Sequence, residues 1–458
     1  MRLPVGPFDG RKKRSRCAAC AKSHLKCSGN YPCNNCRKKQ ISCTFETQKP
    51  MKICIDYAES GDKIDATLDV SVTRSGPSSQ MGMNLSNNHT QYLAKYFNTF
   101  LQNNIVNPRT NGFTDVVSLM KEEVVGGFLQ HAVLSIGAMQ AVKLNSFEGI
   151  DASKAYGLAF HRLPSSLHCV LWTTHLLGLF ELMTDPSGAG WVQHLVHGTS
   201  KALVATGPRV CQSVIGQRFF TEIRVFEACR SIIFNEPTFL ASPDWTLVGQ
   251  QIQDKDQKDN HGLNELLNII VSSSTLRVRV RGLLYPGDIQ TPDHEGMDHG
   301  NAYDIVSEGF RLRQALIDCE ASLPSPSSEK TNDFVVTNGF CLLAQAFISA
   351  TSIYLSGVFD YEMPYWQDMG IAPPTLNEEE IQMHVSNILA TTDVILGSSP
   401  ISPLLVLFPL RVAGARSWQQ WQQDHIMQCL LAVEMTFPVA AAFRADLHGL
   451  WAQRDNLI

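Results

Sequence analysis

Six cysteines lie within 27 residues near the start of this 458-residue chain, which holds 13 cysteines in all. Their spacing is Cys-x2-Cys-x6-Cys-x5-Cys-x2-Cys-x6-Cys, so the second half repeats the spacing of the first. A segment this short with so few large apolar side chains cannot bury a useful core. Its fold must therefore come from cross-links between the cysteines or from a metal that they bind. The six are Cys17, Cys20, Cys27, Cys33, Cys36 and Cys43.

The charge of the chain is divided unevenly along its length. Residues 1–52 hold 13 of the 38 Lys and Arg residues but 2 of the 43 Asp and Glu residues, which leaves 25 basic and 41 acidic side chains in residues 53–458. A basic arm on an acidic body is typical of a protein that contacts a polyanion with one end. We therefore expect the basic end to bind DNA or RNA in a salt-sensitive way.

The rest of the sequence favours a reducing compartment. Residues 1–6 contain no apolar stretch that would form a signal peptide. No membrane span is predicted, because the most apolar tracts, 404–410 and 429–443, are short or interrupted. In a reducing compartment clustered thiols bind metal more often than they form disulfides.

Zinc is the metal that the cysteine spacing favours. Zinc prefers four tetrahedral thiolates, and a Cys-x2-Cys pair can place two sulfurs on one ion. Two separate sites would need eight sulfurs, whereas six suffice if two of them bridge the ions. We therefore predict two zinc ions in one compact cluster. A zinc module for protein contacts and an RNA-binding module stay open as alternatives, although stacking aromatic residues are nearly absent from the module.

The cysteine module resembles the fungal zinc binuclear cluster, the six-cysteine DNA-binding domain of fungal transcription regulators. The resemblance covers residues 17–43 and rests on all five spacings, together with Lys26-Cys27, Pro32 and Asn35-Cys36. It implies that Cys17 and Cys33 bridge the two ions. It also implies that one site is completed by Cys20 and Cys27 and the other by Cys36 and Cys43.

The same resemblance implies how the module would bind double-stranded DNA. In such domains a short helix after the first cysteine pair enters the major groove at a CGG triplet. Base contacts are expected first from Lys26, then from His24, with Lys22 beside them. Fewer basic residues stand here than in most of the family. Phosphate contacts, which position without specifying, are expected from Arg37, Lys38, Lys39, Arg11, Lys12, Lys13, Arg14 and Arg16.

The sequence divides into four parts. We predict a basic arm at 1–16, the zinc cluster domain at 17–46, a polar linker at 47–90 and an all-α body at 91–458. Apolar residues recur at helical spacing from Tyr92 onward, and strand-like alternation is scarce. No sustained heptad follows the cysteine module, so a coiled-coil dimer is not predicted and the oligomeric state is left open.

The body resembles the fungal-specific transcription factor domain in several short fragments. These run in the expected order along the chain and include Trp191–Gly198, Phe234–Leu240 and Pro409–Gly414. By contrast, the sequence contains no enzyme motif whose spacing fits the known pattern. The histidines of His294–His299 are five residues apart rather than four, so they would not share a helix face. We therefore expect no enzyme.

Together these features predict a sequence-specific, DNA-binding regulator of transcription by RNA polymerase II that works in the nucleus. Its expected partners are DNA with CGG-type sites, the transcription machinery and a small-molecule effector. By resemblance it would control a biosynthetic gene cluster for secondary metabolites. The alternatives are a ligand-sensing regulator of lipid or nutrient genes, or a zinc-stabilised interaction module that does not read DNA.

Overall fold

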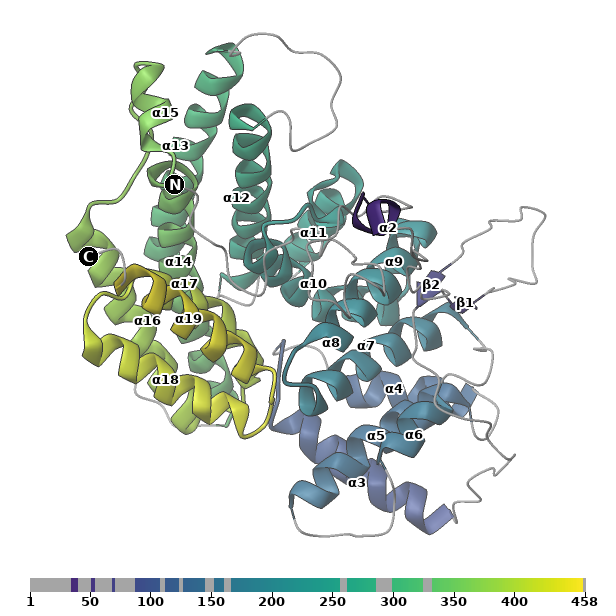
Figure 1. Cartoon of the computed structure of the whole chain (residues 1–458). Helices are drawn as coiled ribbons and strands as arrows, with labels where there is room; N and C mark the ends of the chain where they lie inside the picture. The colour runs from purple at the N-terminus through teal and green to yellow at the C-terminus, as the bar shows by residue number, and fades with distance from the viewer. Residues whose placement is uncertain are drawn as a thin grey trace. The chain divides into compact units, whose positions relative to one another are not determined.

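The computed structural model describes residues 34–39, 51–53, 68–70, 87–107, 112–122, 127–144, 152–159, 166–255, 262–285, 299–323 and 332–455. The chain divides into two compact units. One contains Met83–Ile458 and the other Phe8–Gly82. The described part of the larger unit is built from helices joined by loops (Figure 1).

The larger unit begins with α3 (Asn87–Gln102), α4 (Gly112–Glu122), α5 (Phe128–Lys143), α6 (Ala152–Leu158) and α7 (Leu167–Thr184). Its middle contains α8 (Ala189–Val192), the π-helix η1 (Gln193–Ser200), α9 (Lys201–Thr206), the 3-10 helix η2 (Pro208–Gln212), α10 (Val214–Phe234), the 3-10 helix η3 (Phe239–Ala241), α11 (Pro243–Lys255) and α12 (Leu263–Leu284). Its last part contains α13 (His299–Ser322), α14 (Asn332–Asp360), α15 (Met363–Asp368), α16 (Glu378–Ser398), the 3-10 helix η5 (Pro403–Val406), α17 (Leu407–Arg416), α18 (Gln420–Glu434) and α19 (Ala440–Asp455).

The prediction of an all-α body is confirmed. Helix α3 carries the apolar stripe that begins near Tyr92, and it buries Leu93, Phe97 and Phe100. It starts at Asn87, four residues before the predicted boundary of the body. Helical periodicity identified this element because apolar residues every three or four positions line one side of a helix.

The described residues of the smaller unit form one short helix and one pair of short strands. The helix is α2 (Asn34–Lys39), and β1 (Met51–Ile53) pairs antiparallel with β2 (Leu68–Val70) so that Met51 lies opposite Val70. The strands fall in the segment that the sequence predicted as linker. Three residues each are too few for alternation to be recognised. The predicted domain boundaries stay predictions, and most of residues 44–86, where a heptad repeat would follow the cysteine module, lie outside the described residues.

The core of the larger unit centres on α14. This helix packs against α12, α13, α16 and α17, and Figure 1 shows it surrounded by these neighbours. Among the described residues, Asn338–Asp360 is the one helical stretch long and apolar enough to cross a membrane. The tracts predicted from the sequence as most apolar, 404–410 and 429–443, do not include it. Because 78% of its most apolar window is buried inside the unit, the stretch serves as a core helix.

A backbone connection joins the start of the helical unit to a loop far along the chain. The amide of Ile105 donates to the carbonyl of Pro400 at 2.9 Å, and the carbonyl of Ile105 accepts from the amide of Ser402 at 2.9 Å. Residues 105 and 401 thereby form an isolated parallel bridge. Helix α16, which ends just before this loop, begins with a capping box between Asn377 and Glu380. Both ends of α16 are therefore fixed.

The packing of α5 against α3 depends on a glycine. A Cβ at Gly137 of α5 would lie 2.5 Å from the backbone carbonyl oxygen of Leu93 in α3. Because that contact is with backbone, it can be relieved only by moving the helices apart. We expect Gly137→Ala to lower the free energy of unfolding by about 1–3 kcal/mol, measured by urea denaturation of the full-length protein.

Gly157 of α6 provides the matched control for this substitution. No atom lies within 4 Å of a Cβ built at Gly157. Alanine favours helix over glycine by about 0.5–1 kcal/mol, so Gly157→Ala should leave stability unchanged or raise it. Equal destabilisation by the two variants would show that the effect of Gly137→Ala does not come from the close contact between α3 and α5.

Candidate zinc centre and nucleic-acid interface

Helix α2 is the part of the cysteine module that the structure describes. It places Cys36 inside, with 1% of its surface exposed, and leaves Arg37, Lys38 and Lys39 exposed. The three cations occupy the last turn of the helix, where the negative end of the helix dipole favours positive charge. One thiol therefore faces the interior of the module while three cations face solvent.

Most of the predicted site lies outside the described residues. This holds for five of the predicted zinc ligands and for eight of the predicted DNA-contacting residues. The five are Cys17, Cys20, Cys27, Cys33 and Cys43, and the eight are Lys22, His24, Lys26, Arg11, Lys12, Lys13, Arg14 and Arg16. Their roles, and the zinc-ligand role of Cys36, stay predictions.

The donor set of the module fits zinc. Six thiols within 27 residues supply the soft sulfur ligands that zinc prefers, and the one described among them is buried. A helix of six residues is too short to be stable alone. A bound metal would supply the folding free energy that the module lacks.

A buried ion-pair network joins α10 to Phe234–Leu240, one of the fragments that resemble the fungal-specific transcription factor domain. Arg230 of α10 donates to both carboxylate oxygens of Glu227, at 2.9 and 2.8 Å. It also donates to Glu236 at 2.8 Å and to the carbonyl of Pro237 at 3.0 Å. Thr238 donates to Glu227 at 2.9 Å. The side chains of Arg230 and Glu227 are 5% and 2% exposed, so this network is structural.

His194 belongs to the π-helix η1 and lies in a second, half-buried cluster. Its Nε2 lies 3.0 Å from the hydroxyl oxygen of Tyr156, which also donates to Glu181. Burial lowers the pKa of His194 to about 4, so the ring is neutral near pH 7. Two histidines three residues apart on a helix, as His194 and His197 are, can either hold a metal or form hydrogen bonds within the core. The contact with Tyr156 favours core hydrogen bonding for His194.

Six of the seven cysteines outside the module are described, and all six are buried. Burial is what is expected of isolated structural thiols, but one of the six has further polar neighbours. Cys429 lies beside His425 and Asp393, a grouping that the sequence analysis missed. The available signal was the four-residue spacing of His425 and Cys429 in a helix.

No cavity among the described residues identifies an effector. One hollow of about 460 Å³ lies between η2, α10 and α11, and another of about 190 Å³ is lined by Arg277, Tyr354 and Arg411 among others. The first is open to solvent, and Arg411 is already paired with Asp446 at 2.5 Å. The effector therefore stays a prediction.

Comparison with known proteins identifies the cysteine module. Residues 15–52 match the model of the fungal Zn(2)-Cys(6) binuclear cluster domain. No curated protein and no solved structure matches the chain. The match establishes a domain that binds two zinc ions and DNA, so the predicted cofactor is confirmed.

The chain thus carries a fungal-type zinc cluster domain near its start, which supports a role as a DNA-binding transcription regulator, and the described part of its body is all-helical. Proteins with this domain are transcription factors rather than enzymes, and they are typically nuclear. The resemblance of the body to a fungal-specific transcription factor domain is not part of this match.

Proposed function

We propose that this protein is a nuclear, sequence-specific regulator of transcription by RNA polymerase II whose six clustered cysteines hold two zinc ions. The observation that carries the proposal is the match of residues 15–52 to the two-zinc cluster domain. In this proposal Cys17 and Cys33 bridge the ions, and the other four cysteines complete the two sites. The bound zinc supplies the folding free energy of the module.

The exposed cations of α2 support the proposed mode of DNA binding. Arg37, Lys38 and Lys39 stand on the solvent side of a helix whose inner side carries Cys36. We assign them to phosphates, which hold the module in register on the duplex. Lys26 and His24 read base edges in the major groove at a CGG-type site, because lysine recognises the O6 and N7 acceptors of guanine.

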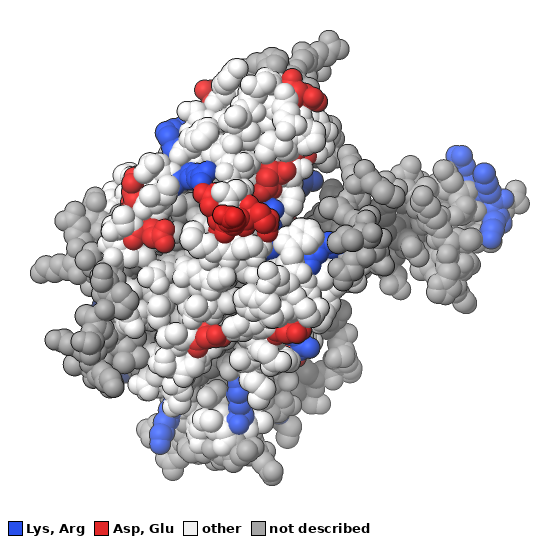
Figure 2. All heavy atoms as spheres, turned by 90° about the vertical axis from the view of Figure 1, so that its left-hand side faces the viewer, with Lys and Arg blue, Asp and Glu red and all other residues white. Residues whose placement is uncertain are grey.

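The body acts in this proposal by recruitment. Figure 2 shows Asp and Glu side chains gathered in groups on one face of the helical unit. Residues 53–458 carry 41 acidic and 25 basic side chains, so this part is repelled by DNA and left available to proteins. We infer that it is a fungal-specific transcription factor domain that meets the transcription machinery. Control of a secondary-metabolite gene cluster and response to an effector belong to the same proposal.

Substituting Lys26 tests the assignment of base contacts. We expect Lys26→Ala in the full-length protein to weaken binding to the preferred duplex by about 1–3 kcal/mol. Because the lost contact is to a base, binding to a scrambled duplex should change little. Fluorescence anisotropy with the two duplexes at several salt concentrations measures both effects. Equal weakening on both duplexes would contradict a role in reading bases.

Lys38→Ala is the matched control, since it removes the same charge from an assigned phosphate contact. Binding to both duplexes should weaken alike. The slope of log affinity against log salt should become less steep by about 0.9. If neither variant changed DNA binding, the alternative of a zinc-stabilised protein-interaction module would be favoured.

A further inference from the structure

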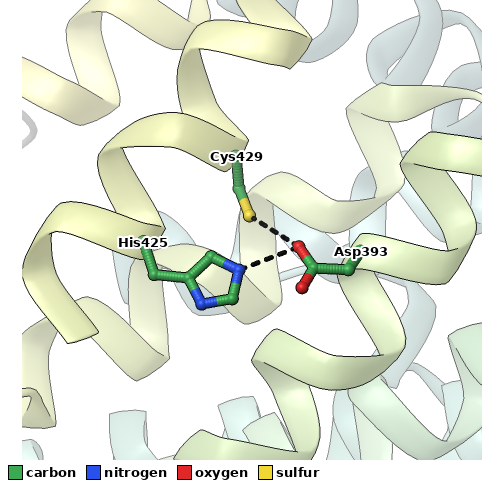
Figure 3. A group of neighbouring side chains, drawn as sticks. All are labelled: Asp393, His425 and Cys429. Carbon is green, nitrogen blue, oxygen red and sulfur yellow. Dashed lines mark hydrogen bonds and ion pairs between the residues drawn. The ribbon is translucent and has the colours of Figure 1, made fainter. Parts of the chain in front are cut away.

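Three potential metal ligands from two neighbouring helices converge outside the zinc cluster domain. Asp393 lies on α16, and His425 and Cys429 lie on α18, as Figure 3 shows. The Oδ1 atom of Asp393 is 2.9 Å from Nε2 of His425 and 3.6 Å from Sγ of Cys429. One ligand atom from each residue lies within 4.8 Å of the others.

The helices fix this arrangement. His425 and Cys429 are four residues apart, so they project from the same face of α18 on successive turns. Helix α16 packs against α18 and presents Asp393 to that face. Cys429 is 4% exposed, whereas the side chains of His425 and Asp393 are 32% and 52% exposed. The group therefore has a buried sulfur at its base and an opening to solvent from which an ion can enter.

The geometry does not suit a cysteine nucleophile. In a Cys–His pair the imidazole must take the proton of the thiol. Here the thiol of Cys429 donates to Asp393 instead. Burial and then the charge of Asp393 raise the pKa of Cys429 to about 12, so the thiol keeps its proton near pH 7. A cation that replaced this proton would be attracted by the carboxylate and by the thiolate formed.

We propose that Asp393, His425 and Cys429 bind a zinc ion through Oδ1, Nε2 and Sγ, with water as the fourth ligand. On binding, the thiol proton leaves to solvent as the bond from sulfur to zinc forms, and the imidazole binds through Nε2 as the tautomer that carries its single proton on Nδ1. Tetrahedral zinc with bonds of roughly 2.0–2.3 Å holds its ligand atoms about 3.3–3.8 Å apart. The distance from Oδ1 to Sγ already lies in that range, and Oδ1 and Nε2 need to separate by a few tenths of an ångström.

The chemistry of the donors selects the metal. A thiolate and an imidazole suit zinc, whereas magnesium and calcium prefer oxygen ligands throughout. The site is independent of the six-cysteine module and joins α16 to α18. A water ligand facing solvent would leave one coordination position for a donor from outside the chain.

Zinc content of the full-length protein tests the proposal. The protein is loaded with zinc, dialysed against a chelator of moderate affinity and analysed by mass spectrometry for zinc per chain. We expect His425→Ala, Cys429→Ser and Asp393→Asn each to retain one zinc ion less per chain than the wild type. His448→Ala, which removes an exposed histidine of α19, should lose none.

The comparison is between variants, so its result does not depend on how fully the six-cysteine cluster is loaded. Circular dichroism identifies any variant that fails to fold. The proposal is then tested on the zinc content of the variants that do fold. Equal zinc content in the wild type and the folded variants would overturn the proposal. Loss of one zinc ion in His425→Ala but not in Cys429→Ser would also overturn the proposal, because the ion would then be held by surface groups without the buried sulfur.

Discussion

Replacing Cys36 by alanine is expected to abolish specific DNA binding by the full-length protein, with a loss of at least about 1000-fold in affinity for the preferred site. A structural zinc site contributes about 10–16 kcal/mol to the folding of a small metal-dependent domain. Cys36 is buried in a helix of six residues, which is too short to be stable alone. Without bound zinc the module therefore has little to stabilise its fold. Binding that remains should be salt-sensitive and independent of sequence, because the basic residues persist. Fluorescence anisotropy with preferred and scrambled duplexes, together with zinc content, measures these effects.

Cys341→Ala is the control for this variant. Cys341 is also buried, at 7% exposure, but it lies in α14 of the helical unit. Its replacement should leave zinc content and DNA binding unchanged. Retention of specific DNA binding by Cys36→Ala would mean that Cys36 is not needed for the cluster. Loss of binding in both variants would mean that the effect is one of general stability.

Arg230→Ala is expected to lower the free energy of unfolding of the helical unit by about 3–5 kcal/mol. The substitution leaves the carboxylate of Glu227 buried without the guanidinium that donates two hydrogen bonds to it. Burying an unpaired charge costs several times more than losing a pair at the surface. Thermal unfolding and urea denaturation of the full-length protein, followed by circular dichroism, measure the loss. Specific DNA binding at low temperature should survive, since the network is remote in sequence from residues 15–52.

The surface pair of Arg311 and Glu308 offers the matched comparison. The side chain of Arg311 is 73% exposed, so water screens its charge. Arg311→Ala should change stability by about 0–1 kcal/mol. A similar small effect of Arg230→Ala would contradict the structural importance of the network around Glu227.

The zinc module was predictable because its metal ligands lie close together in the sequence at a recognisable spacing. Six cysteines, the basic residues beside them and the lack of a core are all visible without the fold. The all-α body was also predictable, since helical periodicity is local and α3 carries it clearly. The strands β1 and β2 were missed because three-residue elements have no detectable period.

Contacts between distant residues could not be predicted in the same way. Nothing in the sequence indicates that Asp393 lies beside His425 and Cys429, because that proximity depends on how α16 packs against α18. The bridge between residues 105 and 401 is equally invisible. The pairing of Arg230 with Glu227 is local, at three residues, but only its burial makes it important. Sequence patterns report periodicity and chemistry, whereas these sites arise from packing between helices.

Selection from a random duplex pool by the full-length protein, with and without a zinc chelator, tests the central claim most directly. A zinc-dependent reader of DNA predicts enrichment of a CGG-containing site that disappears on chelation and returns when zinc is restored. Salt-sensitive binding without enrichment of any sequence would contradict the account. The basic residues near the start of the chain would then hold DNA nonspecifically, and the zinc module would serve as a folded tether.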